Sequence, residues 1–70
     1  MGEFISNSVY TLRTKKGLTQ EELASKLAIT RQTVISIEKG NYTPSVLLAL
    51  KIASVFKVPV EDIFSISYEK

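Results

Sequence analysis

The sequence predicts an all-α fold of five short helices, and three observations support this class. Residues 20–39 have the apolar spacing of two short, non-parallel helices that share one seam. A serine or threonine that can cap a helix stands directly before three of the expected helices, at Thr19, Thr30 and Ser45. Residues 45–56 are apolar around most of the helix circumference, which predicts a central core helix.

The boundaries of the first two helices follow from local signals. A helix is expected over residues 7–16, because Gly17 is well suited to end it in a left-handed conformation. A second helix is expected over residues 20–27, since Thr19 and Glu22 have the spacing of a capping box at its start.

Three more helices are expected further along the chain. The third covers residues 31–39 after its cap Thr30, and the fourth covers residues 45–56. Pro59 prevents the fourth helix from continuing, so a short fifth helix is expected at residues 60–64.

The C-terminal tail has the spacing of a β-strand instead. Apolar and small polar side chains alternate along residues 65–69, and residues 3–6 are the only plausible partner in the chain. A two-stranded antiparallel ribbon that joins the termini is one interpretation, and a frayed tail is the other. Isolated ribbons are weak, so this one would have to pack on the domain or on a second subunit.

The third expected helix carries the pattern that points to function. Its outward side chains are polar groups that can form hydrogen bonds: Thr30, Arg31, Gln32, Thr33 and Ser36. Hydroxyl, amide and guanidinium groups are the types that read base edges in the major groove of DNA. In the preceding helix, Ala24 supplies the small side chain that two steeply crossing helices need at their contact. Residues 20–39 therefore form a helix-turn-helix pattern, which predicts DNA binding.

Several separated motifs follow one family's order along the chain: RTKKGLTQ, EELASKLAITRQTVISIEKG, YTPS and LALKIASVFKVPVEDIF. With these motifs, residues 9–64 resemble the lambda-repressor and Cro type of helix-turn-helix domain. The resemblance implies a lambda-repressor-like fold and a small stand-alone transcriptional regulator. The chain departs from the family at the bend, where Ala28 stands in place of the usual glycine. A left-handed backbone is expected there, at a cost of roughly 1 kcal/mol for a residue with a Cβ atom.

Five positions of the third helix are expected to read bases: Arg31, Gln32, Thr33, Ile35 and Ser36. Arginine suits guanine, glutamine suits adenine, and Ile35 could contact a thymine methyl group. Three alternatives remain open. Arg31 could bind only phosphate, Ile35 could pack at the domain edge, and Thr33 could face the second helix.

Phosphate contacts are expected from residues that flank these positions: Lys16, Gln20, Thr30, Lys39, Asn41 and Tyr42. Gln20 opens the second helix, where free backbone N–H groups favour an anion, although it could also be an ordinary exposed residue. The family resemblance implies that the loop after the third helix holds the DNA backbone. It also implies that Arg13 and Glu38 form a structural ion pair.

The expected regulator is a repressor that binds a palindromic operator as a homodimer, because one helix-turn-helix reads only about half a turn of DNA. The residues after the fourth helix are more apolar than a small core requires. With two loop residues they are assigned to the dimer contact: Thr43, Pro44, Val60, Ile63, Phe64, Ile66 and Tyr68. An antitoxin-type or other protein-interaction module with the same fold is the alternative.

Charge is distributed unevenly, although the net charge is only +2. Basic residues gather in the first forty positions: Arg13, Lys15, Lys16, Lys26, Arg31 and Lys39. Acidic residues gather near the C-terminus, at Glu61, Asp62 and Glu69. This polarity is consistent with a basic face toward phosphate, and equally with an ordinary mixed surface.

Composition argues against several other functions. The chain has no cysteine and no histidine, so no disulfide, thiol catalysis or typical transition-metal site is expected. Adjacent acidic pairs on helices point in different directions, so no enzyme activity, cofactor or small-molecule effector site is expected. No apolar run approaches the ~20 residues that span a bilayer, and no signal peptide is apparent. A cytoplasmic protein, located at the nucleoid when bound to DNA, is the expectation.

Overall fold

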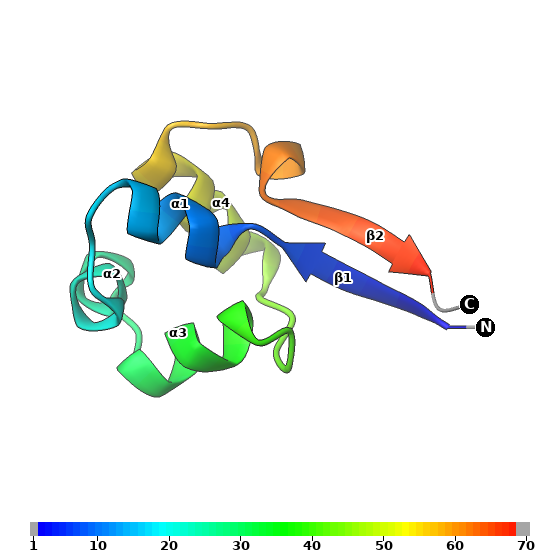
Figure 1. Ribbon diagram of the computed structural model, residues 1–70, viewed down its shortest axis with the longest axis horizontal. Coiled ribbons are helices and arrows are strands. Elements are labelled where there is room, and N and C mark those ends of the chain that lie inside the picture. Colours follow the sequence, from blue (N-terminus) through cyan, green and yellow to red (C-terminus); the bar gives the residue numbers. More distant parts are fainter. Residues whose placement is uncertain (1, 69–70) are drawn as a thin grey trace.

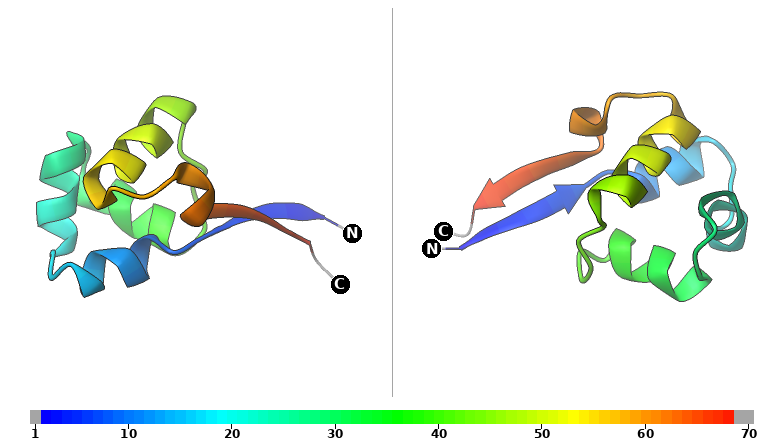
Figure 2. Two further views of the ribbon diagram at one scale, coloured as in Figure 1. Left: turned by 90° about the horizontal axis from the view of Figure 1, so that it is seen from above. Right: turned by 180° about the vertical axis from the view of Figure 1, so that it is seen from behind.

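The computed structural model describes residues 2–68, so Glu69 and the predicted end of the second strand lie outside the described residues. Its elements are β1 (Glu3–Asn7), α1 (Val9–Lys15), α2 (Gln20–Leu27), α3 (Arg31–Glu38), α4 (Val46–Phe56) and β2 (Phe64–Tyr68). The helices form a cluster, and the two strands form a ribbon that projects from it (Figure 1). Both views in Figure 2 show this ribbon extending away from the helices. Among the described helices, none combines the length and hydropathy needed to cross a membrane.

The predicted antiparallel ribbon is confirmed. Its register pairs Glu3 with Tyr68 at the outer end and Asn7 with Phe64 at the inner end. The hydroxyl oxygen of Ser6 lies 3.0 Å from that of Ser65 and 2.9 Å from that of Ser67. One face of the ribbon therefore carries a cluster of serine hydroxyls.

The predicted fifth helix is wrong. The structure has only a single 3₁₀ turn at Val60–Asp62, in which the N–H of Asp62 donates to the carbonyl of Pro59. Phe64 already belongs to β2, so too few residues lie between Pro59 and the strand to close an α-helix. The described residues therefore contain four α-helices and one two-stranded sheet.

The predicted helix caps at Thr19, Thr30 and Ser45 are confirmed. Each hydroxyl accepts a hydrogen bond from the backbone N–H three residues later, and Thr19 and Glu22 complete the capping box. These caps satisfy N–H groups that have no partner within the helix. The first helix starts later than predicted, at Val9, because Asn7 is the last residue of β1.

The bend between α2 and α3 has the geometry expected from the sequence. Ala28 lies in the left-handed region, with φ 57° and ψ 42°. Lys57 ends α4 in almost the same conformation, with φ 58°, and no local sequence pattern predicts it. Both residues carry a Cβ atom where glycine is the least strained choice.

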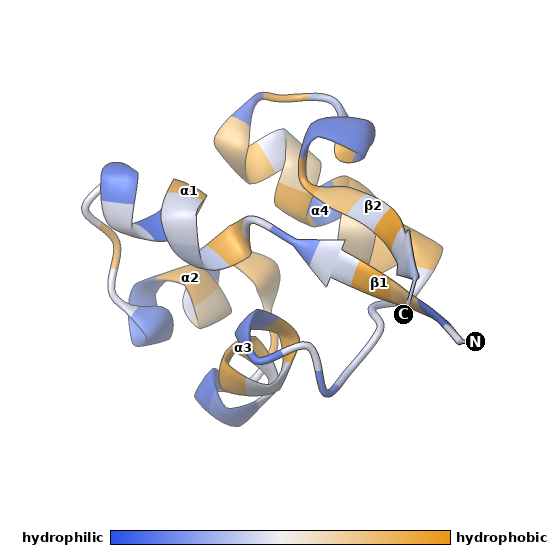
Figure 3. Ribbon diagram, turned by 45° about the vertical axis from the view of Figure 1, so that its right-hand side comes forward, coloured by the Kyte–Doolittle hydropathy of each residue, from blue (hydrophilic) through white to orange (hydrophobic). Residues whose placement is uncertain are grey.

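The core is built from residues of all four helices and the segment before β2: Val9, Leu23, Ala24, Leu27, Val34, Ile37, Leu48, Ile52, Ala53, Phe56 and Ile63. α4 is the expected central core helix through Leu48, Ile52, Ala53 and Phe56, but only on one side. Val46, Leu47 and Leu50 are exposed by 78%, 67% and 54%. Figure 3 shows that much of α4 is coloured as hydrophobic, whereas polar and apolar segments alternate along the ribbon. One side of α4 thus packs in the core, and the other presents apolar side chains to solvent.

Candidate nucleic-acid interface

The outer side of α3 and the loop after it enclose a hollow of about 360 Å³. The hollow is lined by Thr30, Gln32, Thr33, Ser36, Asn41 and Tyr42. Hydroxyl and amide groups dominate this lining, and no carboxylate of residues 2–68 takes part in it. These groups can both donate and accept hydrogen bonds, as the edges of bases require.

The cap of α3 fixes two of these side chains. The hydroxyl oxygens of Thr30 and Thr33 lie 2.8 Å apart, and Thr30 also accepts from the backbone N–H of Thr33. Thr33 therefore lies on the hollow and belongs to the outer side of α3. Gln32 is exposed and makes no hydrogen bond to another residue of the described chain, so its amide is available to a ligand.

Arg31 and Ile35 lie one turn apart on the adjacent side of α3. Arg31 is exposed, and no carboxylate within residues 2–68 forms an ion pair with it. Ile35 is only partly exposed, so an apolar contact with either DNA or protein is sterically open to it.

A buried carboxylate, Glu38, ties α3 to α1. Glu38 Oε2 lies 2.6 Å from Nε of Arg13, and Glu38 Oε1 accepts from Nη2 of Arg13 at 3.2 Å. The two side chains are only 6% and 10% exposed. Nη1 of Arg13 donates to the carbonyl of Leu18 at 2.9 Å, and the ring of Tyr10 lies 5.3 Å from the guanidinium carbon. The ion pair expected from the resemblance is present.

Hydrogen bonding to Glu38 raises the pKa of the Arg13 guanidinium above its ordinary value, although burial partly opposes this. Because Glu38 neutralises it at close range, Arg13 adds little positive potential to the protein surface. Its role in the structure is to hold the end of α3 against α1.

Gln20 also donates to this carboxylate. Its Nε2 lies 3.2 Å from Oε1 of Glu38, so one N–H of the amide is already used within the protein. The other N–H and the amide oxygen remain for a ligand. The phosphate contact predicted for Gln20 stays a prediction, now restricted to that remaining half of the amide.

The other residues predicted to bind phosphate are exposed. Lys39 ends α3, and Asn41 and Tyr42 follow it in the loop. The backbone N–H of Asn41 donates to the carbonyl of Ser36 at 2.9 Å, which fixes the loop against the helix. Lys16 lies at the end of α1, outside the lining of the hollow.

Residues assigned to a dimer contact differ in their exposure. Ile63 is only 3% exposed and belongs to the core of its own chain, so its assignment to an interface is wrong. Val60 and Phe64 are partly buried against the core, whereas Ile66 and Tyr68 are exposed by 58% and 63%.

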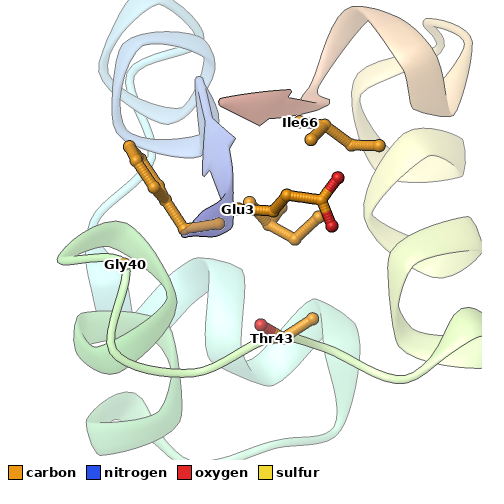
Figure 4. A pocket seen from close by; sticks show the side chains of 6 residues that line it. Glu3, Gly40, Thr43 and Ile66 are labelled. Atoms are coloured by element: carbon orange, nitrogen blue, oxygen red, sulfur yellow. The ribbon is translucent and has the colours of Figure 1, made fainter. Parts of the chain in front are cut away.

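The loop residues Thr43 and Pro44 face the ribbon. Together with Ile5, Val46 and Phe64 they line an apolar hollow of about 160 Å³. A second, wider hollow of about 390 Å³ lies between the ribbon and the loop, and Figure 4 shows Glu3 and Ile66 on one side and Thr43 on the other. The structure thus brings two loop residues and the ribbon to one surface.

Comparison with known proteins identifies the family. The profile of the helix-turn-helix family matches residues 9–63, which include all four helices. The chain belongs to the helix-turn-helix family.

Individual members of the helix-turn-helix family cover most of the chain. YgzD of Bacillus subtilis, an HTH-type transcriptional regulator, is 48% identical over 93% of this chain and 98% of its own. The cryptic phage CTXphi transcriptional repressor RstR of Vibrio cholerae is 31% identical over 86% of this chain and 54% of its own. The crystal structure of the restriction-modification controller protein C.AhdI from Aeromonas hydrophila has a TM-score of 0.71. It is 33% identical and covers 77% of this chain and 82% of its own.

Sequence reasoning missed one residue that positions the helix-turn-helix. Asn7 accepts from the backbone N–H of Val9 at 3.1 Å and donates from Nδ2 to the carbonyl of Ile37 at 2.9 Å. An asparagine two residues before a helix is a recognisable cap, so half of this role could have been found. The contact with Ile37 spans thirty residues, and no local pattern predicts it. Asn7 therefore connects the ribbon to the end of α3.

Proposed function

We propose that this chain is a transcriptional regulator that binds double-stranded DNA in a sequence-specific manner, with α3 in the major groove. The observation that carries the proposal is the hollow on α3, where Gln32, Thr33 and Ser36 meet the loop residues Asn41 and Tyr42. A polar surface without carboxylates, on the outer side of a capped helix, suits a groove lined by base edges and bordered by phosphates.

Base reading is assigned to the exposed positions of α3. Within residues 2–68 the amide of Gln32 and the guanidinium of Arg31 have no hydrogen-bond or ion-pair partner. The amide can bond adenine through two atoms, and the guanidinium can bond guanine in the same way. Thr33 and Ser36 add hydroxyl contacts, and Ile35 supplies an apolar contact to a thymine methyl group. Hydroxyl contacts discriminate less strongly, so Arg31 and Gln32 carry most of the specificity.

Contacts to the DNA backbone are assigned to residues around the hollow: Lys16, Gln20, Thr30, Lys39, Asn41 and Tyr42. Each neutralised phosphate releases condensed counterions, so affinity should fall steeply as the salt concentration rises. These contacts position the domain and apply to any DNA sequence.

The regulator acts as a homodimer on a palindromic operator. Two recognition helices related by a two-fold axis would lie about one helical turn, ~34 Å, apart. The exposed Ile66 and Tyr68, with the partly buried Val60 and Phe64 and the loop residues Thr43 and Pro44, offer an apolar surface for the second copy. Repression is the proposed outcome, and it is supported by the similarity to a transcriptional repressor.

The experiment that tests base reading is a fluorescence anisotropy titration of Gln32→Ala on two duplexes. One duplex carries the site that the unmodified protein prefers, and the other has a random sequence. Loss of the amide should weaken binding to the preferred site by ~1–3 kcal/mol and leave random DNA nearly unaffected.

Ser54→Ala is the matched control, because Ser54 is exposed on α4 and lies outside the hollow. Ser54→Ala should change neither the affinity for the preferred duplex nor the affinity for the random duplex. If Gln32→Ala weakens binding to both duplexes equally, Gln32 contacts only the backbone and does not read a base.

A further inference from the structure

The outer edge of β2 is an unprotected strand edge. The sheet has only two strands, so each strand has one edge without a hydrogen-bonded neighbour in the described chain. Residues 64–68 of β2 contain no charged residue, proline or glycine. Natural proteins usually block exposed edges with such residues, because an open edge pairs readily with another strand.

The two edges of the ribbon differ in their surroundings. Phe4, Ser6 and Asn7 of β1 line a hollow together with Glu38 and Lys39, so the edge of β1 lies over the end of α3. β2 lies on the side of the ribbon that is away from α3 (Figure 1). A strand can therefore approach β2 without touching the polar hollow on α3.

The backbone groups that face this open edge follow from the ladder. At the inner end of the ribbon the N–H of Ser8 donates to the carbonyl of Ile63 at 3.0 Å, next to the pair of Asn7 and Phe64. A bond in this place flanks a pair whose own N–H and C=O groups point away from the partner strand, so Ser6 and Ser65 form the next hydrogen-bonded pair. Such pairs alternate along an antiparallel ladder. The N–H and C=O groups of Ser65 and Ser67 therefore face β1, and those of Phe64, Ile66 and Tyr68 face outward.

We propose that β2 pairs with β2 of a second copy of this chain, antiparallel about a two-fold axis at Ile66, to form a four-stranded sheet. The proposal specifies the dimer contact of the proposed function and rests on it. In this register Ile66 pairs with Ile66 of the partner subunit, and Phe64 pairs with the partner's Tyr68. The backbone N–H and C=O groups of Phe64, Ile66 and Tyr68 then bond to the partner strand, in about six hydrogen bonds across the new interface.

The side chains in this register are compatible with one another. Ile5 already pairs with Ile66 within the ribbon, so four isoleucines would lie in one row across the new sheet. On the opposite face, Ser65 would meet the partner's Ser67 and extend the cluster of serine hydroxyls. No charged side chain of residues 64–68 would oppose a like charge, because these strands have none. A second copy is thus a better occupant of this edge than a charged peptide.

The first test compares two lysine substitutions at apolar residues of similar exposure, followed by sedimentation equilibrium without DNA. Ile66 is 58% exposed and Leu50, on α4, is 54% exposed, so neither change should unfold the chain. Ile66→Lys places two ammonium groups opposite each other on the two-fold axis, and should raise the dimer dissociation constant roughly tenfold or more. Leu50→Lys should leave the constant unchanged.

The second test measures amide hydrogen exchange by NMR on the unmodified chain at two protein concentrations. The amides of Phe64, Ile66 and Tyr68 should exchange roughly tenfold more slowly at the concentration that favours the dimer, because pairing shields them. The amides of Ser65 and Ser67 already bond to β1 and should change less.

Three results would overturn the proposal. The first is that the chain stays monomeric at high protein concentration. The second is a dimer that Leu50→Lys disrupts and Ile66→Lys does not. The third is that the exchange rates of the Phe64, Ile66 and Tyr68 amides do not change with protein concentration. Both tests are carried out without DNA, so they can disprove strand pairing while the titration still supports base reading by Gln32. The titration can likewise disprove base reading while strand pairing is supported.

Discussion

Two exposed surfaces of this chain are chemically opposite. Around α3 and the following loop the exposed side chains are amides, hydroxyls and cations, and Gln32, Ser36 and Asn41 line one polar hollow. On α4 and the ribbon large apolar side chains are exposed among polar ones, with Leu50 and Ile66 more than half exposed. This difference supports the two proposed partners, which are DNA for the polar surface and a second copy of the chain for the apolar one.

The two regions are also held in different ways. The end of α3 is fixed by a buried ion pair, in which Glu38 binds Arg13 from α1 and also accepts from Gln20 of α2. The ribbon is held by one strand pair and by partly exposed serine hydroxyls, with Ile66 and Tyr68 open to solvent. A two-stranded ribbon is marginal alone. The polar surface is therefore preorganised, whereas the proposed strand pairing with a second copy would add stability to the ribbon.

The largest expected effect comes from removing the buried carboxylate. Glu38→Ala leaves the Arg13 guanidinium buried without its counter-charge and removes the acceptor of Gln20. The free energy of unfolding should fall by ~3 kcal/mol, measured in a denaturant melt, since breaking one side of a buried pair leaves an uncompensated charge.

Glu61→Ala is the control for this change, because Glu61 is an exposed carboxylate in the 3₁₀ turn. Its effect should stay within about 0.5 kcal/mol. If the two variants lose equal free energy of unfolding, the ion pair stabilises α3 no more than an ordinary surface charge does. The proposed difference in stability between the two regions would then be wrong.

A smaller effect of opposite sign is expected at Ala28 and Lys57, the two described residues with a Cβ atom in the left-handed region. Ala28→Gly at the bend before α3, and Lys57→Gly on the way to the ribbon, should each raise the free energy of unfolding by up to about 1 kcal/mol. The glycine relieves the strain of a Cβ atom at φ 57° or 58°, although greater freedom of the unfolded chain offsets part of the gain.

Ala49→Gly provides the matched control for both, because Ala49 lies inside α4 with helical neighbours. There glycine should lower stability by ~1 kcal/mol. A loss of stability at Ala28 comparable to that at Ala49 would show that the bend is not strained.

Local signals in the sequence predicted much of this structure. The left-handed bend at Ala28 was implied by the family resemblance. The caps at Thr19, Thr30 and Ser45 depend instead on a few neighbouring residues. Those neighbours are visible in the sequence, which is why these predictions are confirmed.

Contacts between distant segments could not be read from local spacing. The bond from Gln20 to Glu38 and that from Asn7 to Ile37 join residues that packing alone brings together. The apolar composition of α4 predicted a core helix but did not reveal which of its sides faces solvent. The ribbon takes the last residue of the expected fifth helix, because Phe64 pairs with Asn7.

The two surfaces are proposed to have separate roles, one in base reading and one in dimerisation. Selection of bound duplexes from a random pool, followed by sequencing, tests this most directly. A polar surface on α3 that reads bases, in a dimer joined through the ribbon, predicts an inverted repeat. Its half-sites should be centred about one helical turn, ~34 Å, apart. With Ile66→Lys the selected half-site sequence should stay the same, and the enrichment of two half-sites at this spacing should decrease. A pool without enriched sequence, or with one isolated site and no repeat, would contradict this picture.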